Sequence, residues 1–255
     1  MVGVTTAHPP IGRSRMPVNG TVALVTGANR GLGRALVTAL LARGAAKVYA
    51  AARRVETVAD LAAADRRVHP LRLDLTDLEQ IARAAQTATD ATMLINNGGS
   101  LHFADPLTGD LAAIDADLRT NFVGPLALSR ALVPVLEGNG GGAIVNTLSL
   151  VVLGAVPAMG GYSASKAAAA SMTQALRAQL AGRKVTVHGV FPGAVDTDMI
   201  RDFAIPKTSP ADVAAAILDG VEAGEESIFP DPMARQGHRA WREDPAAFER
   251  QMGSM

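Results

Sequence analysis

The sequence contains no cysteine. Disulfide bonds, thiolate metal sites and cysteine nucleophiles are therefore excluded for this chain. Histidine is also scarce, with five residues at positions 8, 69, 102, 188 and 238. Their separations do not match the short spacings of metal-ligand motifs, so we expect no catalytic metal.

The chain carries no net charge, because 24 lysine and arginine residues balance 24 aspartate and glutamate residues. There is thus no electrostatic case for binding nucleic acid or an anionic membrane. Residues 138–165 carry no charged side chain, but glycines, Asn146, Ser149 and Pro157 interrupt this stretch. It fits a buried strand over 143–147 leading into an active-site loop better than a membrane span.

The domain organisation is simple. The 255 residues show no internal repeat, so we expect a single catalytic domain over 18–255, long enough for a large core. Residues 1–17 contain three prolines and predict a flexible extension without the apolar core of a secretion signal. The tail over 233–255 is apolar enough to dock on its own body or on a partner. We expect a cytoplasmic protein.

Short apolar runs typical of strands alternate with helical patterns. The runs lie at 22–25, 47–51, 69–73, 92–95, 143–147, 185–190 and 227–229, and the helical patterns at 34–43, 77–88, 108–137, 161–181 and 210–222. Apolar strands separated by helices predict an α/β fold: a Rossmann-like doubly wound parallel sheet of about seven strands with helices on both faces. Asn121 and Pro125 interrupt 108–137, where we expect a kink or a local opening.

A glycine-rich turn, TGANRGLG over 26–33, follows the first predicted strand and precedes a helical pattern. In this setting glycines let the main chain approach a pyrophosphate, which lies at the partly positive end of the helix. The spacing is G-x3-G-x-G rather than G-x-G-x-x-G. A strand, a glycine turn and a helix in this order predict a dinucleotide site.

Tyr162 and Lys166 are four residues apart in a predicted helix, with Ser149 thirteen residues before the tyrosine. The four-residue step places the phenol and the ammonium on one helix face. A neighbouring positive charge favours the ionised phenol, so we expect the pKa of Tyr162 to fall from its usual value of about 10. These groups suit proton exchange with a carbonyl/alcohol pair, which also needs a hydride carrier.

Together these motifs resemble the short-chain dehydrogenase/reductase family in its single-domain form. The matching positions are 26–33, Asp74, the NNGG motif at 96–99, Asn121, Ser149, Tyr162, Lys166 and the PGAVDT motif at 192–197, and the resemblance covers about residues 20–230. Gly98 stands where the family usually has alanine. We expect this departure to alter local stiffness rather than to remove the site.

The resemblance implies a cofactor site made of Gly27, Asn29, Arg30, Gly31, Leu32, Gly33, Arg53, Asp74, Leu75, Asn97, Gly98, Tyr162, Lys166, Pro192, Gly193, Val195 and Thr197. Enzymes that use NAD usually carry a carboxylate after the second strand, where this chain has Ala52. Arg53 and Arg30 suit the 2′-phosphate of NADP. The sequence therefore predicts NADP(H), unless both arginines are only solvated surface residues.

The resemblance also assigns roles in catalysis. Tyr162 is the general acid/base, Lys166 assists it and binds the nicotinamide ribose, and Ser149 polarises the substrate oxygen. Asn121 matches an asparagine that holds a water linked to the lysine, although an asparagine capping an interrupted helix would look the same. Candidate substrate-binding residues, chosen by position, are Ser149, Tyr162, His102, Val151, Val156, Met159 and Met199. His102 is alternatively a solvated loop residue.

The mostly apolar lining predicts a small-molecule substrate, a hydrophobic ketone or aldehyde and its alcohol, with reduction as the preferred direction. We expect a homodimer or homotetramer formed through 108–137 and 161–181, where the run of alanines at 167–170 offers a small-residue surface. Those alanines alternatively pack against the protein's own sheet. A non-catalytic NADP(H)-binding regulator is the rival function, but the presence of serine, tyrosine and lysine argues against it.

Overall fold

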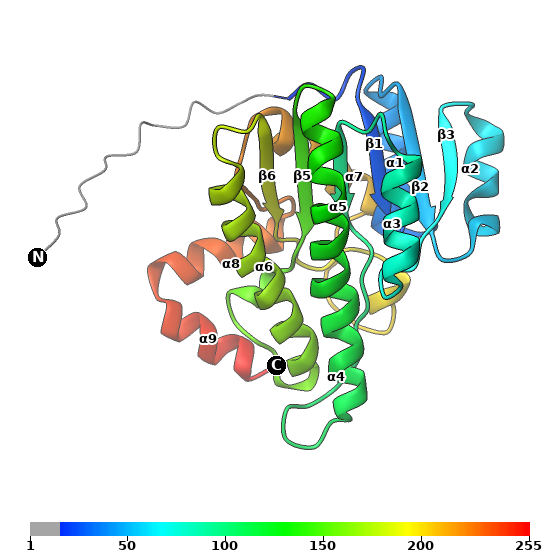
Figure 1. Ribbon diagram of the computed structural model, residues 1–255. Helices are drawn as coiled ribbons and strands as arrows, with labels where there is room; N and C mark the ends of the chain where they lie inside the picture. Colours follow the sequence, from blue (N-terminus) through cyan, green and yellow to red (C-terminus); the bar gives the residue numbers. More distant parts are fainter. Residues whose placement is uncertain (1–15) are drawn as a thin grey trace, which may run out of the picture.

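The computed structural model describes residues 16–255, so the N-terminal extension expected over 1–17 lies almost entirely outside the described residues. Seven parallel strands form one sheet in the order β3-β2-β1-β4-β5-β6-β7 (Figure 1). They are β1 (Val22–Thr26), β2 (Lys47–Ala52), β3 (Val68–Arg72), β4 (Met93–Asn96), β5 (Gly142–Thr147), β6 (Val185–Val190) and β7 (Ser227–Ile228). The predicted doubly wound parallel sheet is confirmed, with the strand order reversing between β1 and β4.

Helices cover both faces of the sheet (Figure 1). They are α1 (Gly31–Ala42), α2 (Ala59–Ala64), α3 (Leu78–Thr87), α4 (Leu111–Leu118), α5 (Gly124–Gly138), α6 (Gly160–Leu180), α7 (Pro210–Glu222), α8 (Pro232–Glu243) and α9 (Pro245–Gly253). Leu36 of α1 and Ile217 of α7 belong to the core on one face. Leu132 of α5 and Leu176 of α6 belong to the core on the other. Burial on both faces explains why the inner strands β1, β4 and β5 are mostly apolar.

The long helix predicted over 108–137 is three segments. Helix α4 ends at Leu118, a π-helical turn spans Arg119–Val123, and α5 continues from Gly124. The expected local opening is therefore present, and it contains Asn121 as expected. A π-helical turn inserts an extra residue into the helix and is frequent at functional sites.

The sequence-based prediction missed α8 and α9 in the C-terminal tail. Both begin with an Asp-Pro pair: Asp231 caps α8 by accepting from the Ala234 amide, and Asp244 caps α9 by accepting from the Ala247 amide. An N-cap aspartate followed by proline at the first helical position is a recognised helix start. The sequence therefore contained a start signal for each of these two helices.

The tail docks on its own body. Phe248 and Met252 of α9 are buried against Leu150 and Val156. Of the two expectations for the tail, the described residues therefore show the first, docking on the protein's own body. None of the helices within 16–255 combines the length and the apolar character that crossing a membrane would require.

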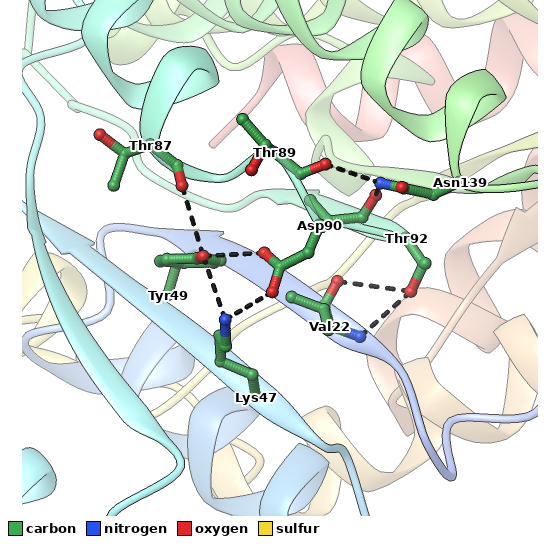
Figure 2. A network of polar contacts seen from close by, with 9 residues as sticks. Val22, Lys47, Tyr49, Thr87, Thr89, Asp90, Thr92 and Asn139 are labelled. Atoms are coloured by element: carbon green, nitrogen blue, oxygen red, sulfur yellow. Dashed lines mark hydrogen bonds and ion pairs between the residues drawn. The ribbon is translucent and has the colours of Figure 1, made fainter.

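A polar network closes the amino-terminal edge of the sheet (Figure 2). Tyr49 of β2 donates a 2.8 Å hydrogen bond to Asp90, which precedes β4, and Lys47 also pairs with Asp90. Asn139, just after α5, donates to the carbonyls of Thr89 and Ala91. This network joins the starts of strands β2 and β4 and leaves the opposite, carboxyl edge of the sheet open for a ligand.

Candidate active site

A cavity of about 920 Å³ lies at the carboxyl ends of the strands. Its lining includes every residue predicted for cofactor or substrate binding; of the predicted site residues only Asn121 lies outside it. Residues far apart in the sequence meet there because strands β1 to β6 all end on this edge. This is where a ligand binds in open α/β sheets.

The glycine turn leads into the first helix at one end of the cavity. Gly31 has a φ of +51°, which favours glycine. A Cβ built on Gly33 would lie only 2.1 Å from the carbonyl oxygen of Gly27, so no larger residue fits between the turn and the helix. Arg30, the N-cap of α1, makes no side-chain cap hydrogen bond. The first amides of α1 therefore suit an anionic group placed in the cavity.

Ser149, Tyr162 and Lys166 converge on the other end of the cavity. Tyr162 and Lys166 lie one turn apart near the start of α6, and Ser149 follows β5. The Lys166 ammonium lies 5.7 Å from the centroid of the Tyr162 ring and donates a 2.8 Å hydrogen bond to the carbonyl of Thr147. The lysine side chain is 5% exposed, so its position is well defined.

The expected lowering of the tyrosine pKa is wrong for this structure. Burial raises the pKa of Tyr162 to about 12, and the nearby Ser149 hydroxyl only partly opposes this effect. Burial also lowers the pKa of Lys166 to about 8, while the negative charge of Asp117 acts in the opposite direction. The residue spacing showed that the ammonium is close, but it did not show that desolvation has the larger effect on the phenol.

Asn121 stands behind the catalytic side chains, in the π-helical turn. Its amide donates to the carbonyl of Ser100 and to the hydroxyl of Ser165, and its oxygen accepts from the Ser100 amide. A second cavity of about 10 Å³, large enough for roughly one water molecule, is lined by Asn121, Lys166 and Thr147 among others. The Thr147 hydroxyl has no hydrogen-bond partner among the residues that the structure describes.

The NNGG segment after β4 packs against the glycine turn. Asn97 donates to the carbonyl of Thr26, and the Thr26 hydroxyl accepts from the amides of Asn97 and Gly98. Thr26 is therefore a supporting residue that the list of predicted site residues lacks. Asn96 instead donates to Ser129 and to Asn146, away from the turn. It is buried in the sheet and lines the small second cavity, not the large one.

The two arginines predicted for cofactor recognition both line the cavity. Arg30 forms a 3.3 Å ion pair with Asp198, and both side chains are well exposed. An exposed pair of this kind contributes little stability, so the guanidinium is free to exchange partners. Ala52, which is buried, leaves no carboxylate at the end of β2.

Two further predicted cofactor residues, Asp74 and Gly193, are held by hydrogen bonds to other parts of the protein. The Asp74 carboxylate accepts from both the amide and the hydroxyl of Thr76. The Gly193 amide donates to Asp231, a fully buried residue that also caps α8. Asp231 thus couples the PGAVDT segment to the C-terminal helices, a connection that only the tertiary structure reveals.

The substrate side of the cavity is mostly apolar. Val151, Val156, Met159 and Met199 line it as predicted. The prediction missed Phe103, Phe203, Ile205, Met233, Met252 and Met255, which also line it. The rings of Phe103 and Phe203 stack with centroids 5.7 Å apart across two loops. Within residues 16–255, no group of three or more side chains is arranged to hold a metal ion.

Comparisons with known proteins agree with this geometry. The family model for short chain dehydrogenases matches residues 21–206. A dehydrogenase/reductase SDR family protein 7-like from Anopheles gambiae is 32% identical, covering 87% of this chain and 78% of that protein. An NADP-dependent 3-hydroxy acid dehydrogenase from Schizosaccharomyces pombe is 29% identical, covering 87% of this chain and 95% of that protein.

A solved structure of a short chain dehydrogenase is also similar to this chain. A short chain dehydrogenase from Burkholderia cenocepacia J2315, crystallised in complex with NADP, superposes with a TM-score of 0.88 at 42% identity, covering 93% of this chain and 99% of that one. The family match spans well over half of the chain. The chain therefore belongs to the short-chain dehydrogenase/reductase family, and it is an oxidoreductase of that family.

Proposed function

We propose that this protein is an NADPH-dependent carbonyl reductase that converts a hydrophobic ketone or aldehyde to its alcohol. The observation that carries the proposal is the shared cavity, which brings Ser149, Tyr162 and Lys166 to one end and the glycine turn to the other. NADPH supplies the hydride when it is bound. The Ser149 hydroxyl donates a hydrogen bond to the carbonyl oxygen, and Tyr162 transfers its proton to that oxygen as the carbon is reduced.

The choice of NADP(H) rests on charge. The residues present fit this cofactor, because Gly31 and Gly33 let the turn pack tightly against Thr197 and Gly27, and the first amides of α1 suit a pyrophosphate. Ala52 offers no carboxylate to repel a 2′-phosphate, and Arg30 and Arg53 are placed to pair with it. The Burkholderia relative was crystallised with NADP, and the Schizosaccharomyces relative is named as NADP-dependent.

We assign Lys166 to the nicotinamide ribose and to the electrostatics of Tyr162. We assign Asn121 the role of holding a water molecule beside Lys166, because the small cavity that both residues line has the size of about one water molecule. The unpartnered Thr147 hydroxyl also lines that cavity. A water bound there would connect the ammonium to further polar groups, and a proton relayed along this chain from solvent would replace the one that Tyr162 gives up.

A panel of ketones, aldehydes and secondary alcohols, followed by NADPH absorbance, tests the proposed function. We expect turnover of ketones with apolar substituents, because the substrate side of the cavity is lined by methionine, valine and phenylalanine side chains. The rival function is that of a non-catalytic NADP(H)-binding regulator. Tight NADPH binding without turnover of any carbonyl compound or alcohol would favour the regulator.

A further inference from the structure

Apolar side chains gather at the mouth of the large cavity. Eight large apolar side chains are exposed among residues 16–255, and half of them line this cavity: Phe103, Met199, Ile205 and Met255. We call these four residues the apolar rim. Exposing such side chains to water is unfavourable, and a cluster of them at the entrance of a pocket is typical of a surface that a ligand covers. The rim is therefore an extension of the substrate side of the cavity.

Phe103 is held in place by the residues on either side of it in the chain. The His102 amide donates to the buried carboxylate of Asp117 at 3.1 Å, and the ring nitrogen Nδ1 of His102 lies 2.7 Å from the same carboxylate. The carbonyl of Ala104 accepts from the amide of Gly161, next to the catalytic tyrosine, at 3.3 Å. His102 is thus an anchor of this loop rather than a freely solvated side chain. Phe103 keeps a fixed place relative to the catalytic tyrosine.

Phe203 reaches Phe103 from a second loop. This loop begins at Thr197, which packs so closely on Gly31 of the glycine turn that a Cβ built there would lie 2.9 Å from the threonine methyl group. The two phenylalanine rings stack with centroids 5.7 Å apart and planes inclined by 26°. One loop is therefore anchored at the catalytic end of the cavity and the other at the cofactor end. Phe103 is still 57% exposed, so the stack leaves much of its ring open to a ligand.

Thioether groups surround the same part of the cavity. Five of the nine methionines of the chain line it, at positions 159, 199, 233, 252 and 255. Methionine sulfur makes favourable contacts with aromatic rings, and its flexible side chain adapts to a flat group. Aromatic rings also attract one another beyond the effect of buried area. Phenylalanine and methionine together therefore favour an aromatic group over an alkyl group of the same size.

We propose that the substrate carries an aromatic ring, which binds against the Phe103–Phe203 stack and the methionines of the cavity. The carbonyl group that is reduced lies at Tyr162. A short flexible spacer joins it to the ring, because Phe103 is separated from the tyrosine by the contact between Ala104 and Gly161. The substrate class is thus an arylalkyl ketone or aldehyde. This inference rests on the proposed function and deepens it by naming the part of the substrate that does not react.

The first test compares 4-phenyl-2-butanone with 4-cyclohexyl-2-butanone. The two ketones share the carbonyl group, the spacer and the ring size. The cyclohexyl group has the larger apolar surface, so burial of area alone would favour the cyclohexyl ketone. We expect kcat/KM with NADPH to be at least about fivefold higher for the phenyl ketone, mainly through KM. Equal values, or a preference for the cyclohexyl ketone, would overturn the inference.

Variants locate the source of this preference. Phe103→Leu and Phe203→Leu keep an apolar side chain and remove the aromatic ring, so each should abolish most of the preference for the phenyl ketone. Phe229→Leu is the matched control, because Phe229 stacks on Phe191 with centroids 5.1 Å apart and neither ring lines the cavity. This control should keep the parental preference. A preference that survived in both cavity variants would overturn the inference.

A second readout needs no turnover. In the complex with NADP⁺, saturating 4-phenyl-2-butanone should move the methyl ¹H–¹³C signals of Met199 and of other cavity methionines through the ring current of the phenyl group. The cyclohexyl ketone has no ring current and should move them much less. Unchanged methionine signals with the phenyl ketone would contradict the inference. Ring-current shifts without reduction of either ketone would instead count against the proposed function and leave the inference standing.

Discussion

The Lys166 ammonium lies 5.7 Å from the centroid of the Tyr162 ring, yet its hydrogen bond goes to the carbonyl of Thr147. Burial raises the pKa of Tyr162 to about 12 and lowers the pKa of Lys166 to about 8. At neutral pH the phenol therefore holds its proton and most of the lysine remains charged. This is the protonation state that reduction of a carbonyl group requires, because Tyr162 has to donate.

The first prediction concerns pH. Lys166 is charged below its pKa of about 8 and loses the charge as the pH rises through that value, whereas Tyr162 stays protonated. We expect kcat/KM for carbonyl reduction to decline above about pH 8. Asp117→Asn removes a charge that raises the lysine pKa, so the decline should begin at lower pH in this variant. Rates measured at constant ionic strength that stay flat up to about pH 10 would contradict the assignment.

Cofactor preference gives the second prediction. Arg30 and Arg53 can pair with a 2′-phosphate, and each charge-assisted bond contributes about 1.5–3 kcal/mol before screening. We expect kcat/KM with NADPH to exceed that with NADH by about ten- to a thousandfold. Replacing Ala52 by Asp and Arg53 by Ser should shrink or invert this preference, because it adds repulsion and removes attraction. Equal parental values with the two cofactors would show that the arginines do not select the phosphate.

The third prediction concerns the C-terminal helix. Met252 is buried against Leu150 and Val156 and also lines the cavity, whereas Met255 lines the cavity but is 70% exposed. Met252→Ala should lower the free energy of unfolding by about 2 kcal/mol and raise KM, because it opens a gap in the cavity wall. Met255→Ala is the control and should leave the stability unchanged. Chemical denaturation of both variants makes the comparison, and equal stabilities would show that α9 is not packed as described.

The sequence predicted much of this arrangement, for identifiable reasons. Ser149 and Pro192 follow apolar runs, and parallel strands that alternate with helices bring such positions to one edge. The four-residue step between Tyr162 and Lys166 likewise places them on one helix face. Asp117 could not be found in this way. In the sequence it looks like any polar residue of an amphipathic helix, and only the fold brings it next to His102. The pKa of Tyr162 could not be predicted either, because it is set by burial, which the residue spacing does not show.

Association is the fourth prediction. Ala169 and Ala170 are buried against the protein's own Leu148, just after β5, so these two residues are not open to a partner. Ala167 on the same helix is exposed and leaves room for a helix of a second copy. We expect light scattering to give a mass two or four times the chain mass of 26.3 kDa. A single species of 26.3 kDa at micromolar concentration would refute the association.

The most direct test of the central claim, that Tyr162 donates the proton in an NADPH-dependent carbonyl reduction, is the variant Tyr162→Phe. The ring keeps its packing in α6 and loses only the hydroxyl, so NADPH should bind with nearly the parental affinity. Single-turnover reduction of a ketone that the parent accepts should fall by about a thousandfold or more, since the proton donor is gone. Near-parental NADPH affinity with almost no reduction is the result we predict. A variant that kept a tenth of the parental rate or more would contradict the account.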